Sequence, residues 1–234
     1  MGFAGFDRKL YPGDDAMAAW KSGSSYSFVG YYLPSPCHPN ASWAGKRATL
    51  IAQGWGLAVV YVGRQQSGAC QHREFSAAQG TTDGQDAIAR AQQDGFGAGT
   101  TIFLDVEKLT DAGDSDFQDY FKAWIGALLD DPIGYRPGVY CSHLDANDLF
   151  NLAQSAYAAH NLPGGAPKFW VVRLFNDFSP ALDEPTRSEI AYANVMQGHI
   201  SPDPLDNGQP YSETYNGVTL DIDVDVADSA NPSG

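Results

Sequence analysis

The chain has 234 residues, of which 43% are hydrophobic, 12% aromatic and 18% charged, enough for one domain with a sizeable core. Acidic residues outnumber basic ones by 28 to 14, and the net charge of −14 argues against nucleic acid or an anionic membrane as a partner. No apolar run is long enough to cross a bilayer, so we expect no membrane insertion, and residues 1–10 lack the pattern of a signal peptide.

Segments rich in β-forming residues alternate along the chain with helix-like segments. Strands are expected at 3–7, 27–33, 56–63, 100–107, 136–142, 168–174, 194–200 and 217–226. Helices are expected at 14–22, 44–55, 83–96, 115–130, 145–160 and 183–193. Thr82 or Asp83 is the predicted N-cap of the third helix and Gly95 or Gly97 its stop. The fourth helix carries a core-facing stripe of Phe117, Phe121, Trp124, Ile125 and Leu128.

This alternation predicts parallel βαβ units. Eight units in 234 residues approach the size of a (β/α)8 TIM-like barrel, which has roughly 250 residues. The competing open, doubly wound sheet would prefer a glycine-rich phosphate turn after its first strand, and the segment 7–15 has none. We therefore expect a single α/β domain at 1–228. Its last βα unit should be irregular, because 201–216 shows no helix pattern, and 229–234 should be a flexible tail.

Carboxylates stand where several of these strands end. Asp7 ends the first strand, Asp105 and Glu107 end the fourth on one face, and Asp223 lies in the eighth. In a barrel of this type the C-terminal strand ends form the active face. A single carboxylate at a strand end is explained by a helix cap or a salt bridge as well as by a catalytic role. Several in one pocket repel each other and raise at least one pKa, which suits a general acid beside an ionised partner, as sugar hydrolysis requires.

Other chemistry is less well supported by the residues. Cys37 with His38, and Cys70 with His72, match no zinc-ligand spacing, and the acids of 223–228 do not form an EF-hand loop. We therefore expect neither a metal nor a cofactor. Aromatic side chains at strand ends, Tyr31 and Tyr61 among them, are candidates for stacking on sugar rings, although most such residues fill cores.

Several motifs taken together resemble a known family. They are "GFD" (5–7), "FVGYY" (28–32), "IFLDVE" (102–107), "GVYCS" (138–142) and "DIDVDVAD" (221–228). In order and spacing they resemble the glycoside-hydrolase-like bacterial domain (domain of unknown function 1906), a relative of the family-25 lysozymes, over roughly 3–228. The resemblance implies that Glu107 is the acid/base, that Asp105 and Asp7 assist it, and that Asp223, Tyr140 and Gln197 contact substrate. Arg173, at the end of the sixth strand, is a further candidate for substrate binding.

Two functions follow as hypotheses. The first is a lysozyme-like (muramidase-like) glycoside hydrolase of bacterial cell-wall glycan. Glu107 would protonate the leaving oxygen, and Asp105 or Asp7 would be nucleophile, base or orienter of an acetamido group. The second is a catalytically inactive carbohydrate-binding or envelope-associated barrel, since binding a sugar needs the same side chains as cleaving it. In both cases the partner is a polysaccharide or peptidoglycan fragment, and we expect a monomer.

Three cysteines bear on the compartment. Cys37 and Cys70 follow neighbouring strands, so their loops should emerge side by side and allow a disulfide, while Cys141 should be a buried thiol. This favours a secreted or envelope protein. Three reduced thiols in a cytoplasmic protein are the alternative, and it stays open from the sequence.

Overall fold

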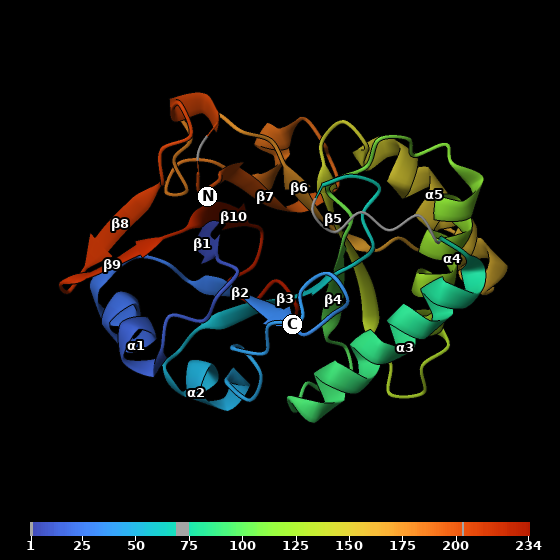
Figure 1. The fold of residues 1–234 in the computed structure, drawn as a ribbon, viewed down its shortest axis with the longest axis horizontal. Coiled ribbons are helices and arrows are strands. Elements are labelled where there is room, and N and C mark those ends of the chain that lie inside the picture. Colours follow the sequence, from blue (N-terminus) through green and yellow to red (C-terminus); the bar gives the residue numbers. More distant parts are fainter. Residues whose placement is uncertain (1, 69–74, 203) are drawn as a thin grey trace.

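The computed structural model describes residues 2–68, 75–202 and 204–234. Eight strands close into a barrel in the order β1-β10-β7-β6-β5-β4-β3-β2, with helices around it (Figure 1), which confirms the predicted TIM-like barrel. The barrel strands are β1 (Phe3–Asp7), β2 (Phe28–Leu33), β3 (Gly56–Val62), β4 (Thr101–Asp105), β5 (Arg136–Ser142), β6 (Lys168–Val172), β7 (Ala193–His199) and β10 (Asp223–Ala227). The α-helices are α1 (Asp14–Gly23), α2 (Arg47–Ala52), α3 (Ala77–Gln93), α4 (Ser115–Leu129) and α5 (Ala146–Ala159).

The closing strand departs from the expected all-parallel barrel. Strands β1 to β7 pair in parallel, but β10 runs antiparallel to both of its neighbours, β1 and β7. The predicted strand 217–226 is in fact two strands: β9 (Val218–Asp221) pairs with β8 (Ser212–Tyr215) in a hairpin, and β10 follows it. A parallel strand needs a crossover that carries the chain back to the other end of the sheet. The hairpin and the short 3₁₀ turn η2 (Pro204–Asp206) replace that crossover, so β10 starts at the end where β7 stops.

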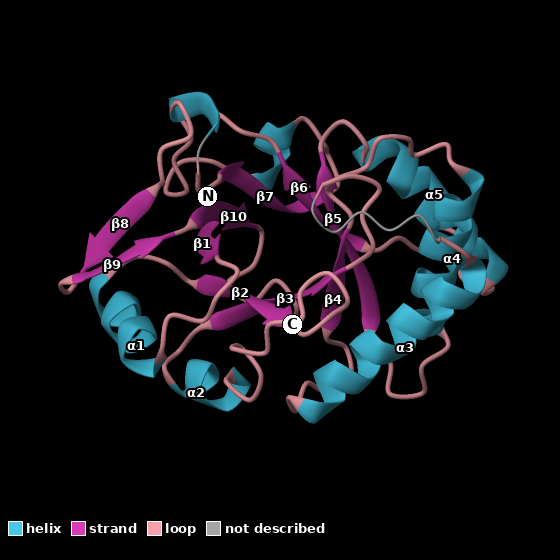
Figure 2. Cartoon of the chain, viewed as in Figure 1, coloured by secondary structure: helices cyan, strands magenta, loops and turns pink. Residues whose placement is uncertain are grey.

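The hairpin lies against α1 at one side of the barrel, while α3, α4 and α5 lie at the other (Figure 2). Trp20 of α1 donates its indole N–H to the carbonyl of Val218 at 2.9 Å. The last βα unit is therefore irregular, as predicted. The predicted helix at 183–193 is wrong: the chain forms only the 3₁₀ turn η1 (Pro185–Ser188), which ends at Glu189 with a left-handed φ of 67°.

Helix α3 begins earlier than the sequence predicts. Its N-cap is Ser76, whose hydroxyl accepts from the N–H of Gln79 at 3.2 Å, and not Thr82 or Asp83. Glycines such as Gly80 and Gly84 usually interrupt a helix, but here they lie inside α3 and face α4. A Cβ on Gly80 would stand 2.1 Å from the carbonyl oxygen of Tyr120. The two glycines therefore let α3 and α4 pack closely, and the predicted apolar stripe of α4 is buried beside them.

Glycines also make room inside the barrel. A Cβ on Gly5 would overlap the Phe28 ring, and one on Gly138 would stand 2.6 Å from Phe103. A Cβ on Gly30 would stand 2.5 Å from the Cβ of Asp7. Missing side chains on the inner face thus create the space that the rings and the Asp7 carboxylate occupy.

Residues 229–234, for which a flexible tail was predicted, are hydrogen-bonded to the barrel. They lie at the N-terminal ends of β3 and β4, where Ser233 Oγ accepts from the N–H of Val59 at 2.8 Å and Asn231 Oδ1 from that of Leu57 at 2.9 Å. Thr101 N–H donates to the carbonyl of Ser233 at 2.8 Å. Polar composition suggests disorder, yet these groups bond strand N–H groups that would otherwise be unpaired. Among the described residues, no helix combines the length and apolarity that crossing a membrane requires.

Candidate active site

Four carboxylates lie at the end of the barrel where β1 to β7 stop, which we call the mouth. Asp7 is the last residue of β1, Asp105 is the last of β4, and Glu107 follows two residues later. Asp223 is the first residue of β10 and the register partner of Asp7. Because β10 is antiparallel, its beginning faces the mouth. The predicted acids therefore come together, three at or just after strand ends and one at the start of the reversed strand.

Asp7 is buried, and both of its oxygens accept hydrogen bonds. Tyr32, on the inner face of β2, donates its hydroxyl to Oδ1 at 2.5 Å, and Gln197 of β7 donates Nε2–H to Oδ2 at 2.7 Å. Burial raises the pKa of Asp7 to about 6, with a contribution from the charge of Glu107, while the two hydrogen bonds oppose the rise. The carboxyl therefore titrates close to neutral pH.

Tyr140 and Gln197 connect Asp7 with Glu107. The Tyr140 hydroxyl donates to Gln197 Oε1 at 2.8 Å, and the amide of Gln197 then donates to Asp7. Burial raises the pKa of Glu107, and the nearby Tyr140 hydroxyl opposes that rise. Two residues that the family resemblance assigned to substrate contact thus lie between the two acids.

Glu107 and Asp105 differ in exposure. The side chain of Glu107 is 32% exposed, whereas Asp105 is 6% exposed. Strand β4 ends at Asp105, so the predicted strand is two residues too long, and Asp105 Oδ1 accepts from the N–H of Glu107 at 3.1 Å in a local turn. Burial raises the pKa of Glu107, while the charge of Lys108 and the Tyr140 hydroxyl oppose the rise. Burial, reinforced by the Glu107 charge, raises the pKa of Asp105 well above its usual range.

Strand β10 carries two acids to this region. Asp223 Oδ1 accepts from the N–H of Ser201 at 2.5 Å, and burial next to Asp7 raises its pKa to about 8. Asp225, one step deeper, accepts from the Trp170 indole N–H at 3.0 Å and is fully buried. Its Oδ2 receives no hydrogen bond in the described residues. Burial and the charge of Asp7 raise the pKa of Asp225 well above its usual range. The sequence argument gave Asp225 no role.

Similarity to known proteins agrees with this architecture. The model of the Rv2525c-like, glycoside hydrolase-like domain matches residues 18–227 of the chain. The chain belongs to this glycoside-hydrolase-like family. Among curated proteins, none matches it in sequence.

Solved structures share the fold. An uncharacterized B. stearothermophilus protein aligns with a TM-score of 0.57 and 17% identity over 97% of this chain and 96% of its own. The Mycobacterium tuberculosis Tat-secreted protein Rv2525c in complex with L-tartrate aligns with a TM-score of 0.55 and 15% identity over 97% and 94%. Rv2525c in complex with HEPES gives 0.54 and 14% identity over the same shares. At these identities the likeness shows the fold alone.

Gln65 of this glycoside-hydrolase-like barrel is a site residue that the sequence argument missed. It is 4% exposed and lies after β3. Its Nε2–H donates to the carbonyl of Asp105 at 2.9 Å, and its Oε1 accepts from the N–H of Lys108 at 3.0 Å. Gln66 next to it accepts from the N–H groups of Thr110 and Asp111, each at 2.8 Å. Two adjacent glutamines after a strand carry no signal that separates them from ordinary loop residues.

Two histidines were also without an assigned role. His199 shares the inner face of β7 with Gln197, and its ring stacks on Tyr211 with centroids 4.7 Å apart. His38 is buried 5.1 Å from the Tyr32 ring, and its Nε2 has no partner in the described residues. Burial lowers the pKa of His38 to about 4, so it is neutral at the mouth.

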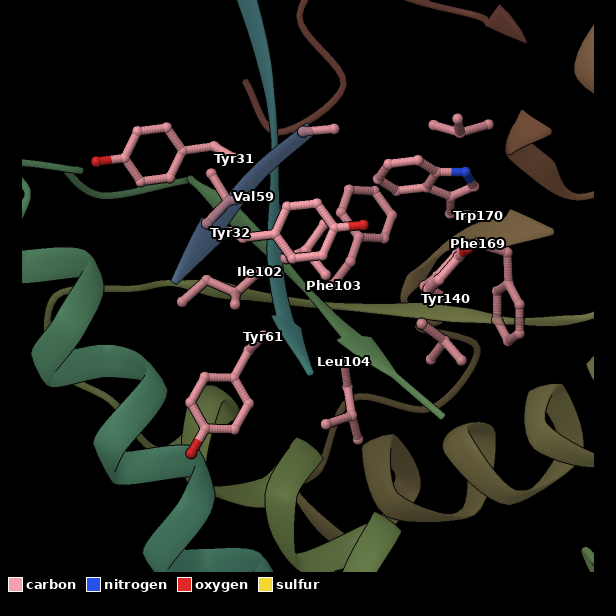
Figure 3. Close-up of a cluster of buried hydrophobic side chains, with 14 of the residues drawn as sticks. Tyr31, Tyr32, Val59, Tyr61, Ile102, Phe103, Leu104, Tyr140, Phe169 and Trp170 are labelled. Carbon is pink, nitrogen blue, oxygen red and sulfur yellow. The ribbon is translucent and has the colours of Figure 1, made fainter. Parts of the chain in front are cut away.

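Tyr31 and Tyr61, which were predicted to contact sugar, point away from the mouth. Tyr31 donates its hydroxyl to Asp94 at 2.7 Å, and Tyr61 donates to Asp86 of α3 at 3.1 Å. Figure 3 shows Tyr61 pointing toward the helices, while Tyr32, Phe103 and Trp170 gather on the other side of the strands. Neighbouring residues of a strand point to opposite faces, so only one tyrosine of the pair 31–32 is able to reach the interior.

Arg173 is occupied away from the four acids. Its guanidinium pairs with Glu189 at 2.7 Å and donates to the carbonyl of Ser188 at 3.0 Å. These contacts brace the connection between β6 and β7 and leave Arg173 outside the hydrogen-bond network of the mouth.

The cysteines separate into two kinds. Cys141 is a free, buried thiol, as predicted. Cys37 is disulfide-bonded, and Cys70, its predicted partner, lies outside the described residues, so that pairing stays a prediction. In the described part of the chain, no three or more His, Cys, Asp or Glu side chains are grouped so that they could hold a metal ion.

The arrangement separates its acids by environment. Glu107 is partly exposed, with 32% of its side chain accessible, whereas Asp7 is buried and hydrogen-bonded on both oxygens by neutral donors. A partly exposed carboxyl whose pKa is raised by burial, beside a buried acid with a pKa of about 6, is suited to acid–base chemistry.

Proposed function

We propose that this barrel hydrolyses glycosidic bonds of bacterial cell-wall (peptidoglycan-type) glycan, with Glu107 as general acid. The carrying observation is that Glu107 combines partial exposure with a raised pKa and lies beside Tyr140, which is hydrogen-bonded through Gln197 to Asp7. Membership of a glycoside-hydrolase-like family supports the reaction class. A protonated Glu107 donates its proton to the leaving oxygen as the bond breaks.

Asp7 and Asp105 have different parts in this proposal. Asp7 is 1% exposed and held by Tyr32 and Gln197, which suits electrostatic stabilisation of the developing positive charge or orientation of a substrate acetamido group. Burial raises the pKa of Asp105, and its Oδ1 accepts from the N–H of Glu107, so we assign it as a positioning residue for Glu107. Asp223, half-buried at the start of β10, is the candidate for direct substrate contact.

The test is release of glycan fragments or clearing of turbidity with purified peptidoglycan. Wild-type protein should release products, and Glu107→Gln, which keeps the shape and removes the acid, should lower the rate by about 10²–10⁴-fold. Glu184→Gln, an exposed glutamate away from the mouth, is the matched control and should leave the rate unchanged. Equal rates for wild type and Glu107→Gln, across several wall types and pH values, would contradict the proposal.

A second candidate is a binding barrel without turnover, and the burial of Asp7 and Asp105 favours it, because neither offers an open nucleophile. The solved complexes of Rv2525c with L-tartrate and HEPES support ligand binding in the family. Saturable binding of muropeptides with no product after days of incubation would select this alternative. If the double variant Glu107→Gln, Asp105→Asn bound muropeptides as tightly as wild type, the carboxylates at the mouth would be unnecessary for both proposed functions.

We further propose export to the envelope or medium, in line with the Tat secretion of Rv2525c and with the disulfide at Cys37. Thiol counting on unfolded, unreduced protein tests the cysteine part. One free thiol, that of Cys141, is expected, and three would contradict it. We expect a monomer, to be checked by light scattering.

A further inference from the structure

A cavity of about 480 Å³ lies at the end of the barrel opposite the mouth. Ser27, Leu57 and Thr100 line it, and they stand at or just before the first residues of β2, β3 and β4. The volume falls within the roughly 300–1,000 Å³ of small-molecule sites. We propose that this cavity binds a small organic oxyanion, a carboxylate or phosphate head on an uncharged, partly apolar body. This site is independent of the function proposed for the mouth.

The charge of the wall points to an anion. In a chain of net charge −14, the charged side chains among the described residues that line the cavity are Lys21 and Arg47, with no aspartate or glutamate beside them. Cations in an acidic protein are normally paired with its many carboxylates. Here two of them face one concave space without an acidic side chain in its wall, and an oxyanion would supply the missing negative charge.

Arg47 carries the strongest part of the argument. Its Nε is buried and has no hydrogen-bond partner, and no ion pair involves Arg47 within residues 2–68, 75–202 and 204–234. Its guanidinium lies over the Phe96 ring, 5.2 Å from the centroid, which orients it at the wall. Arg47 is half-buried and lines the cavity, and a guanidinium is shaped to bind two oxygens of one carboxylate or phosphate.

Lys21 supplies the second cation. Its Nζ lies 4.7 Å from the centroid of the Trp55 ring and donates to the carbonyls of Tyr26 at 2.9 Å and Ser27 at 3.4 Å. An ammonium group has three N–H donors, so it retains capacity for a ligand oxygen. Burial lowers the pKa of Lys21, and a bound anion would oppose that change. Trp55, Phe96, Ile51 and Leu57 give the same wall an apolar part for the body of the ligand.

The C-terminal tail completes the cavity. Four of its residues line the cavity: Ala230, Asn231, Ser233 and Gly234. The tail lies so close to β3 that a Cβ on Gly56 would stand 1.7 Å from the carbonyl oxygen of Ala230, so a glycine is needed there. Ligand binding and tail docking therefore share one surface. A ligand at this site should protect the tail N–H groups from exchange and raise the melting temperature.

The experiment is calorimetric titration of the full chain with phenyl phosphate, benzoate, inorganic phosphate and benzyl alcohol. We expect one site per chain that binds phenyl phosphate or benzoate more tightly than inorganic phosphate and does not bind benzyl alcohol. The tighter of the first two identifies a phosphate or a carboxylate as the preferred head. Amide NMR shifts on binding should centre on Leu57, Asn231 and Ser233.

Variants decide whether the cavity is responsible. Arg47→Gln should weaken binding about tenfold or more, as expected for loss of a charge-assisted pair, and Arg47→Lys should be intermediate. Arg90→Gln removes the same charge from an exposed position on α3 and should bind like wild type. Circular dichroism confirms folding of each variant. Absence of saturable binding, equal affinity in Arg47→Gln, or NMR shifts confined to Tyr32 and Tyr140 would overturn the proposal.

Discussion

At the scale of single residues, burial decides the ionisation of the acids at the mouth. Asp7 and Asp223 are neighbours across β1 and β10, and their pKa values rise to about 6 and about 8. The folded protein therefore binds more protons than the unfolded chain, in which an aspartate titrates near 4. This part of the stability is fully present below about pH 4 and is lost as the pH rises through about 6 and then about 8.

The first prediction tests this pH dependence of stability with the substitution Asp223→Asn. The asparagine oxygen is still able to accept a hydrogen bond from the N–H of Ser201. The variant should be more stable than wild type at pH 8, by about 1–3 kcal/mol, and should differ little at pH 4. Urea unfolding between pH 4 and 8 measures the difference. Asp119→Asn, at an exposed position of α4, serves as control. A variant less stable than wild type at pH 8 would refute the expected sign.

At the scale of elements, the loops after β3 and β4 act together. The loop after β4 carries Glu107, and Gln65 from the loop after β3 bonds the backbone on both sides of it, at Asp105 and at Lys108. The inner face of β2 contributes differently, since Gly30 leaves the space that Asp7 occupies. The position of each acid thus depends on a neighbouring element.

The second prediction concerns Gln65→Ala. Loss of two hydrogen bonds should speed hydrogen exchange at the Lys108 N–H and lower the glycan-release rate mainly through kcat, because Glu107 loses its fixed position. Gln85→Ala, at an exposed position of α3, should change neither. Unchanged exchange at Lys108 would show that the loop is held by other contacts.

The third prediction concerns Gly30→Ala. Its new methyl group would stand 2.5 Å from the Cβ of Asp7 and displace that side chain, so we expect a loss of about 1–3 kcal/mol in the free energy of unfolding and weaker binding of muropeptides at the mouth. Gly97→Ala, where a Cβ would meet no atom within 4 Å, is the matched control. Chemical denaturation and a binding titration report the two effects, and equal behaviour of both variants would count against the tight contact.

At the scale of the whole molecule, the two ends of the barrel are built differently. The mouth holds the acids, and the opposite end is covered by the C-terminal tail, which bonds Leu57, Val59 and Thr101. The last residues of the chain therefore take part in the barrel itself, although they form no strand.

The fourth prediction is that Ser233→Ala destabilises the protein by about 1–3 kcal/mol, because the buried N–H of Val59 loses its acceptor. Ser155→Ala, an exposed serine whose hydroxyl bonds only within α5, should have an effect below about 0.5 kcal/mol. Thermal or urea unfolding compares them. A neutral Ser233→Ala would mean that the tail is dispensable for the barrel end.

The sequence alone determined the features that depend on local order along the chain. Alternating strands and helices, the apolar stripe of α4 and the acids at strand ends follow from periodicity and position, and they led to the barrel and to Asp7, Asp105, Glu107 and Asp223. Only the tertiary structure decided what depends on contacts between distant segments. These are the reversal of β10, the docking of the tail, the glycines inside α3 and the outward turn of Tyr31 and Tyr61. A residue such as Gln65 shows the physical reason: its role lies in hydrogen bonds to residues about 40 positions away, and no local pattern records them.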